Sequence, residues 1–134
     1  MALSSLETST LLFAPPSVVF DLWLDALRMG LIMGGPANID GRAGGHYSLF
    51  DGAVVGEFVF LERPKVIAQT WRTHDFTSGM DDARLELSFG VAPGGTHLRA
   101  VQTHVPPTLR EQFLYGWDHF VFPRLRDHFT SPEM

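Results

Sequence analysis

The sequence of 134 residues contains no cysteine and only one lysine, Lys65. Without cysteine, the chain cannot form disulfides, use a thiol as a nucleophile or bind a metal through thiolates. The first ten residues, MALSSLETST, lack the basic start and the apolar core of a secretory signal. No apolar run approaches the length that crosses a membrane. We therefore expect a cytoplasmic protein without a membrane span.

Basic residues are also outnumbered, because the chain has 10 Lys and Arg against 15 Asp and Glu, a net charge of −5. Proteins that bind nucleic acids usually carry a basic face, so the composition predicts no nucleic-acid partner. Hydrophobic residues make up 45% of the chain, which is enough for a substantial core. The length is typical of one domain, and we predict a single domain over residues 1–134.

The longest segment with helical periodicity runs from Thr108 to Phe129. Thr108 and Glu111 have the spacing of a capping box, which predicts the start of this helix. Pro123 removes one backbone hydrogen bond and predicts a kink near His119. Helical spacing places five apolar residues on one face: Leu114, Trp117, Val121, Leu125 and Phe129. A helix face this rich in aromatic and aliphatic side chains has to be covered by another element.

The first third of the chain predicts a strand and a short helix. The strand is expected over Leu3–Phe13, and the helix over Val18–Met29, with Ser17 as its N-cap and Gly30 as its end. Residues 30–45 are rich in glycine but carry several apolar side chains. Two interpretations stay open: a long connection whose apolar residues pack under the domain, or a mobile lid over a pocket.

The middle of the chain has the two-residue periodicity of strands. Five strands are predicted, separated by short turns: Gly45–Leu49, Val54–Leu61, Val66–Arg72, Ala83–Val91 and Thr96–His104. The short connections predict antiparallel pairing between neighbours. Segregated helices beside an antiparallel sheet give an α+β fold. The terminal helix is the only predicted element long and apolar enough to cover the apolar face of that sheet.

Candidate catalytic and metal-binding residues are few. The six histidines have no metal-ligand spacing, so no metal site is predicted, although His104 and His128 could approach the rim of a cavity. Asp118 and Glu57 would form an acid–base pair only if both entered one cavity. The alternative is that each carboxylate hydrogen-bonds a neighbouring strand or loop. No catalytic residue is therefore predicted.

Three segments together resemble a known family. They are Gly44–Gly52 with Val55–Phe58, then Thr70–Arg72, and finally Gly95–Leu98 followed by Gly116-Trp117. In order and spacing they resemble the C-terminal domain of the activator of heat-shock protein 90 ATPase family, over residues from about Ser5 to Phe129. The resemblance implies a helix-grip, START-like (SRPBCC) fold, in which a curved antiparallel sheet wraps around a long C-terminal helix. It implies no cofactor.

The resemblance also implies a function. We expect a non-catalytic, co-chaperone-like binding module for a heat-shock protein 90-type chaperone, related to stress. Two-domain members carry a separate N-terminal domain that contributes much of the chaperone contact, so we do not expect full co-chaperone activity from these 134 residues.

Two other functions follow from the hydrophobic cavity that this fold implies between sheet and helix. One is the binding or carriage of a small apolar ligand, and the less favoured one is catalysis in the cavity. We expect the cavity to be lined by Tyr47, Phe58, Trp71, Phe89, Leu98, Trp117, Phe120 and Val121. A volume of about 300 Å³ or more would fit a ligand pocket.

Overall fold

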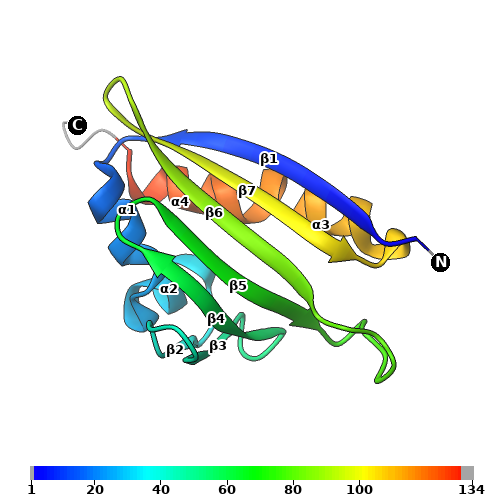
Figure 1. Cartoon of the computed structure of the whole chain (residues 1–134). Coiled ribbons are helices and arrows are strands. Elements are labelled where there is room, and N and C mark those ends of the chain that lie inside the picture. The colour runs from blue at the N-terminus through cyan, green and yellow to red at the C-terminus, as the bar shows by residue number, and fades with distance from the viewer. Residues whose placement is uncertain (1, 131–134) are drawn as a thin grey trace.

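Seven strands form one antiparallel sheet, in the order β1-β7-β6-β5-β4-β3-β2, in a computed structural model that describes residues 2–130. The curved sheet wraps around the long C-terminal helix (Figure 1), which confirms the predicted α+β helix-grip fold. The strands are β1 (Ser4–Leu12), β2 (Asn38–Ile39), β3 (His46–Leu49), β4 (Val54–Glu62), β5 (Val66–Thr73), β6 (Ala83–Ala92) and β7 (Gly95–Val105).

Alternating burial explains why these segments pair as strands. On β6, Leu85, Leu87 and Phe89 are buried while Arg84 and Glu86 are exposed, so one face of the strand turns to the core. β1 pairs with β7 from the far end of the chain, which places it at one edge of the sheet. The sequence did not predict β2, a strand of 2 residues that pairs with β3 at the other edge.

Two short helices replace the single helix predicted over Val18–Met29. α1 (Pro16–Trp23) begins at a proline, so Ser17 lies inside its first turn and is not the N-cap. α2 (Ala26–Met33) begins at a new N-cap, Asp25, whose carboxylate accepts a hydrogen bond from the backbone N–H of Arg28. Gly30 does not end this helix. It ends at Gly34, whose φ of 83° is left-handed.

Residues 30–33 of the glycine-rich segment belong to α2, and the rest of the segment is a connection that includes β2. Met33 is buried, and Ile32 and Ile39 pack against the core, whereas Leu31 is 76% exposed. The apolar residues therefore pack under the domain as the first interpretation proposed, except at Leu31.

The C-terminal helix is built from four parts. A 3-10 turn (η1, Pro107–Leu109) leads into α3 (Arg110–Gly116), a π-helical segment (η2, Trp117–Val121) and α4 (Phe122–His128). Thr108 lies within the 3-10 turn, and the helix start has no side-chain cap, so the predicted capping box is wrong. The helix is irregular where Pro123 was predicted to disturb it, because proline has no N–H for the carbonyl of His119.

The terminal helix is not the only cover of the sheet, which corrects the sequence-based expectation. α1 also packs on β6 and β7. Its Phe20 meets Phe89 of β6 edge to face at 5.3 Å between ring centroids. The two helical layers therefore divide the apolar face of the sheet between them.

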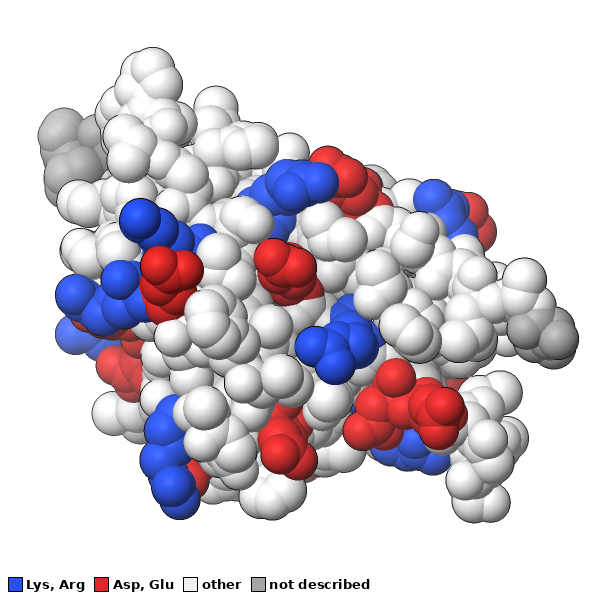
Figure 2. Space-filling view, viewed as in Figure 1, with Lys and Arg blue, Asp and Glu red and all other residues white. Residues whose placement is uncertain are grey.

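The outer face of the sheet carries charges of both signs, as Figure 2 shows. One pair on this face joins Arg99 of β7 to Glu7 of β1 at 2.6 Å, and another pair joins Arg63 of the β4–β5 turn to Asp21 of α1 at 2.8 Å. None of the helices in the described residues is long and apolar enough to cross a membrane.

Candidate functional site

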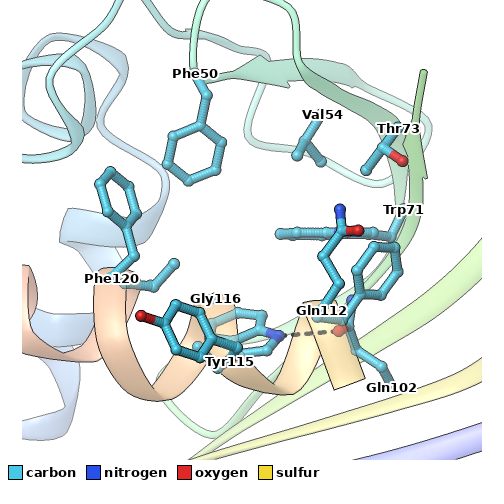
Figure 3. Close-up of a pocket in the computed structure, with 12 residues that line it drawn as sticks. Phe50, Val54, Trp71, Thr73, Gln102, Gln112, Tyr115, Gly116 and Phe120 are labelled. Atoms are coloured by element: carbon cyan, nitrogen blue, oxygen red, sulfur yellow. Dashed lines mark hydrogen bonds between the residues drawn. The ribbon is translucent and has the colours of Figure 1, made fainter. Parts of the chain in front are cut away.

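An open pocket of about 370 Å³ lies between the C-terminal helix and one end of the sheet. Figure 3 shows its lining side chains around a common space. They come from the β3–β4 turn, β4, β5, β7, α3 and η2: Phe50, Val54, Trp71, Thr73, Gln102, Gln112, Phe113, Tyr115, Gly116, Trp117, Phe120 and Val121. The volume falls within the range of small-molecule sites.

Six of the twelve residues that line the pocket are aromatic. Trp71 and Trp117 lie 5.7 Å apart between ring centroids, with their planes tilted by 33°. On the other side Phe50 faces Phe120 at 5.6 Å. Tyr115 stands at the rim and is 66% exposed. Such walls offer π-faces and edges to a ligand, and aromatic partners prefer offset or edge-to-face contacts.

The sheet contributes a buried amide to this pocket. Gln102, on β7, is fully buried, and its Oε1 accepts a hydrogen bond of 2.9 Å from Nε1 of Trp117. This bond fixes the orientation of the amide. Its Nε2 has no hydrogen-bond partner within the described part of the protein. A buried donor without a partner costs free energy, so Gln102 is an unusual residue at this position.

The β5–β6 loop is fastened beside the pocket. Its Phe76 stacks on Phe113, a lining residue, at 6.3 Å between ring centroids. Arg72 holds the base of the loop by donating hydrogen bonds to the carbonyl oxygens of Met80 and Thr77 and to the carboxylate of Asp82. The loop therefore stabilises one wall of the pocket.

Four of the eight residues that the sequence placed in the cavity line this pocket: Trp71, Trp117, Phe120 and Val121. The other four lie deeper in the core. Tyr47 and Phe58 pack on each other at 5.3 Å, Phe89 is covered by Phe20, and Leu98 is 1% exposed. Ligand binding by any of these residues stays a prediction.

The carboxylates considered for catalysis do not meet in the pocket. Asp118 accepts a hydrogen bond of 2.5 Å from the hydroxyl of Thr8 on β1. For this residue the structure therefore agrees with the alternative that the carboxylate hydrogen-bonds a neighbouring strand. Glu57 is exposed on β4, and His104 is exposed at the end of β7. Across residues 2–130, no group of three or more His, Asp or Glu side chains is placed to hold a metal ion.

Sequence reasoning missed the other eight lining residues of the pocket, among them the polar Thr73, Gln102 and Gln112. One signal for Gln102 was available in the sequence, because it shares the apolar face of its strand with Leu98 and Ala100. A polar side chain buried on such a face is unfavourable unless it is hydrogen-bonded. Phe50 carried no such signal. Its position depends on the β3–β4 turn, where Phe50, Asp51 and Gly52 all have positive φ.

The geometry defines a helix-grip domain with a lateral pocket, and comparison with known proteins places it in a family. The profile of the family described as "Activator of Hsp90 ATPase homolog 1-like protein" matches residues 13–130. The chain therefore belongs to this family, which confirms the resemblance drawn from its sequence.

Two similar proteins define the relationship further. An uncharacterized protein of Schizosaccharomyces pombe is 32% identical over 119 residues, 89% of this chain and 33% of that protein. The mouse activator of 90 kDa heat shock protein ATPase homolog 2 is 31% identical over 91 residues, 68% of this chain and 27% of that protein. The chain thus spans about a third or less of the length of these relatives.

A solved structure is similar over nearly its whole length. It is an HSP90 activator from Plasmodium falciparum, with a TM-score of 0.77 and 26% identity, covering 88% of this chain and 91% of that chain.

Proposed function

We propose that this domain is a non-catalytic binding module that contacts a heat-shock protein 90-type chaperone and stimulates its ATPase. The observation that carries the proposal is the match to the Plasmodium falciparum protein, because 91% of a solved chain described as an HSP90 activator aligns with this one domain. Family membership over residues 13–130 supports the same function.

The test is a titration of a purified heat-shock protein 90 with this chain, followed by calorimetry and by the rate of ATP hydrolysis. We expect saturable binding and a faster ATPase. Absence of binding heat at high protein concentration, together with an unchanged ATPase rate, would overturn the proposal. A heat-unfolded sample of the same chain is the control for nonspecific effects of added protein.

A second function, the binding of a small apolar ligand, is favoured by the pocket itself. Its volume of about 370 Å³ and its aromatic walls fit a small molecule. The chain also offers a way to close the pocket without disturbing the core. Gly116 lines the pocket, and a Cβ atom at this position would meet nothing within 4 Å.

Gly116→Leu should therefore fill the space while the helix is retained, and Gly116→Ala is the matched control that fills much less of it. Native mass spectrometry of the wild-type chain should show a co-purified small molecule, which Gly116→Leu loses and Gly116→Ala keeps. Equal retention of the molecule by all three proteins would place it elsewhere and contradict this function.

A further inference from the structure

Two buried glutamines lie on the same face of the sheet and have the same arrangement. Gln69 on β5 and Gln102 on β7 both stand opposite Leu85 of β6, one on each side. Each accepts a hydrogen bond of 2.9 Å from a tryptophan indole, Gln69 from Trp23 and Gln102 from Trp117. The Nε2 group of each amide lacks a hydrogen bond of normal geometry.

The surroundings of the two Nε2 groups differ. Gln69 lies beside the hydroxyl of Tyr47. Burial raises the pKa of that hydroxyl, and the nearby Gln69 amide opposes the rise. Gln69 therefore has a polar neighbour within the core. Gln102 stands between Leu85 of β6 and Leu6 of β1, which offer no side-chain acceptor.

Gln102 is also one of the residues that line the pocket, and Figure 3 shows its side chain beside the pocket space. Its Oε1 already accepts a hydrogen bond from Trp117, whereas Nε2 has no partner, so an acceptor is the group that this side chain lacks. The donor is held in place before any ligand arrives, which lowers the entropic cost of forming a hydrogen bond.

The charge of the ligand follows from the pocket lining. The twelve lining residues of the described chain include no Asp, Glu, Lys, Arg or His. A charged group placed among these aromatic walls would lose hydration without gaining an ionic partner, which is strongly unfavourable. The lining therefore favours a neutral group among these walls.

We propose that the pocket binds a neutral, flat aromatic molecule that carries an oxygen acceptor, and that Nε2 of Gln102 donates a hydrogen bond to this acceptor while Trp71 and Trp117 contact the ring. This inference rests on the second proposed function, ligand binding in the pocket, and names the ligand class. Gln102 acts as the residue that determines specificity.

Coumarin and naphthalene are suitable probes, because both are neutral and flat with two fused rings, and only coumarin has a carbonyl acceptor. Binding is followed by NMR of ¹⁵N-labelled protein, using the side-chain amide signals of Gln69 and Gln102 and the three indole signals. Coumarin should bind about tenfold more tightly than naphthalene, a typical preference for one additional buried hydrogen bond. It should also shift the Gln102 amide protons, while the Gln69 signals stay unchanged.

Gln102→Met keeps a side chain of similar length and removes the donor, and Gln69→Met is its matched control. In Gln102→Met the preference for coumarin should disappear or reverse, because its carbonyl would then be buried without a partner. Gln69→Met should keep the preference. Thermal unfolding of both variants shows whether each remains folded, and the Gln102 amide shift in the wild-type protein tests the contact without any substitution.

The possible outcomes separate the two levels of the proposal. Equal affinity for both probes, or an unmoved Gln102 signal during coumarin binding, would overturn the role of Gln102 while ligand binding in the pocket stands. Failure of both probes to bind would overturn both. A preference for coumarin that survives in Gln102→Met would assign the acceptor contact to another residue and also contradict the inference.

Discussion

Two regions of the helix–sheet interface use the same chemistry to different ends. In the sealed region, which comprises Trp23, Gln69 and Tyr47, α1 covers the sheet and the side chains fill the space. In the pocket region, around Trp117 and Gln102, the same kind of hydrogen bond holds the helix to the sheet beside an open space. The difference lies in the covering element, since α1 reaches only part of the sheet. A pocket therefore results where the helical cover is thinner.

The largest effect is expected at the residue that joins the two regions. Trp117 stacks on Trp23 at 6.1 Å and contacts Trp71 and Phe122, and it is 2% exposed. Trp117→Ala should lower the free energy of unfolding by about 3–5 kcal/mol, because it removes a large buried side chain and the donor to Gln102. Urea denaturation measures the loss.

Tyr115→Ala is the control for Trp117→Ala, since Tyr115 is also aromatic but 66% exposed. Its effect should stay within about 0.5 kcal/mol. A similar loss in both variants would show that Trp117 does not hold the two regions together.

Two glycines give opposite predictions for the two regions. A Cβ atom on Gly56 would lie 2.8 Å from Cε1 of Tyr47 and closer still to the carbonyl oxygen of Thr70, whereas one on Gly116 would meet nothing. Gly56→Ala should therefore destabilise the protein by about 1–3 kcal/mol through overpacking. Gly116→Ala should stabilise it by about 0.5–1 kcal/mol, because glycine is unfavourable within a helix. Thermal unfolding of both variants checks the signs, and a stabilising Gly56→Ala would contradict tight packing in the sealed region.

The two glutamine–tryptophan pairs should contribute similarly to stability although only one lies at the pocket. Gln69→Met and Gln102→Met each leave an indole N–H without its acceptor, and each also removes an amide N–H group that had no hydrogen bond. The loss of the acceptor destabilises the folded protein more than the removal of the unpaired amide N–H group stabilises it. Each variant should therefore lose about 1 kcal/mol of unfolding free energy. Urea midpoints measured side by side test this equality, and a loss confined to Gln69→Met would mean that the Trp117 bond is readily replaced by solvent from the pocket.

The fold was predictable because the periodicity of apolar residues and the turn signals indicate which segments are strands and helices and how they are connected. Strand alternation and short connections gave the sheet order from β3 to β7, and the apolar face of the terminal helix indicated what the sheet surrounds. The break between α1 and α2 was harder to see, because it depends on one cap, Asp25, within an otherwise helical pattern. Local capping competes with periodicity, and the sequence alone does not show which one prevails.

The candidate site was only partly predictable. Trp71, Trp117, Phe120 and Val121 were expected in the cavity that the family resemblance implied between sheet and helix. The same expectation included Phe89, which Phe20 covers in the structure. Whether a facing pair leaves a gap depends on side-chain volumes in three dimensions, which one-dimensional spacing does not contain.

The smallest effect is expected at the surface of the sealed region. Arg63, in the β4–β5 turn, donates hydrogen bonds of 2.8 and 2.9 Å to the two carboxylate oxygens of Asp21 on α1. These bonds hold the pKa of Asp21 below its ordinary value of 3.8. The ion pair therefore stabilises the folded protein fully above that value, and its contribution is lost as the pH falls through the lower pKa of the folded state. Both side chains are more than half exposed, so solvent screening keeps the contribution small.

Asp21→Asn should lower the urea midpoint slightly at neutral pH, and the midpoints of the variant and the wild-type protein should converge in acid. Asp81→Asn, at an exposed position in the β5–β6 loop, is the matched control and should not show this convergence. Because the ion pair fastens α1, the indole N–H of Trp23 should exchange with solvent slightly faster in Asp21→Asn, while that of Trp117 keeps its rate. If both indoles exchanged faster to the same extent, the two regions would open as one unit, and the distinction between a sealed and an open end of the interface would not extend to its dynamics.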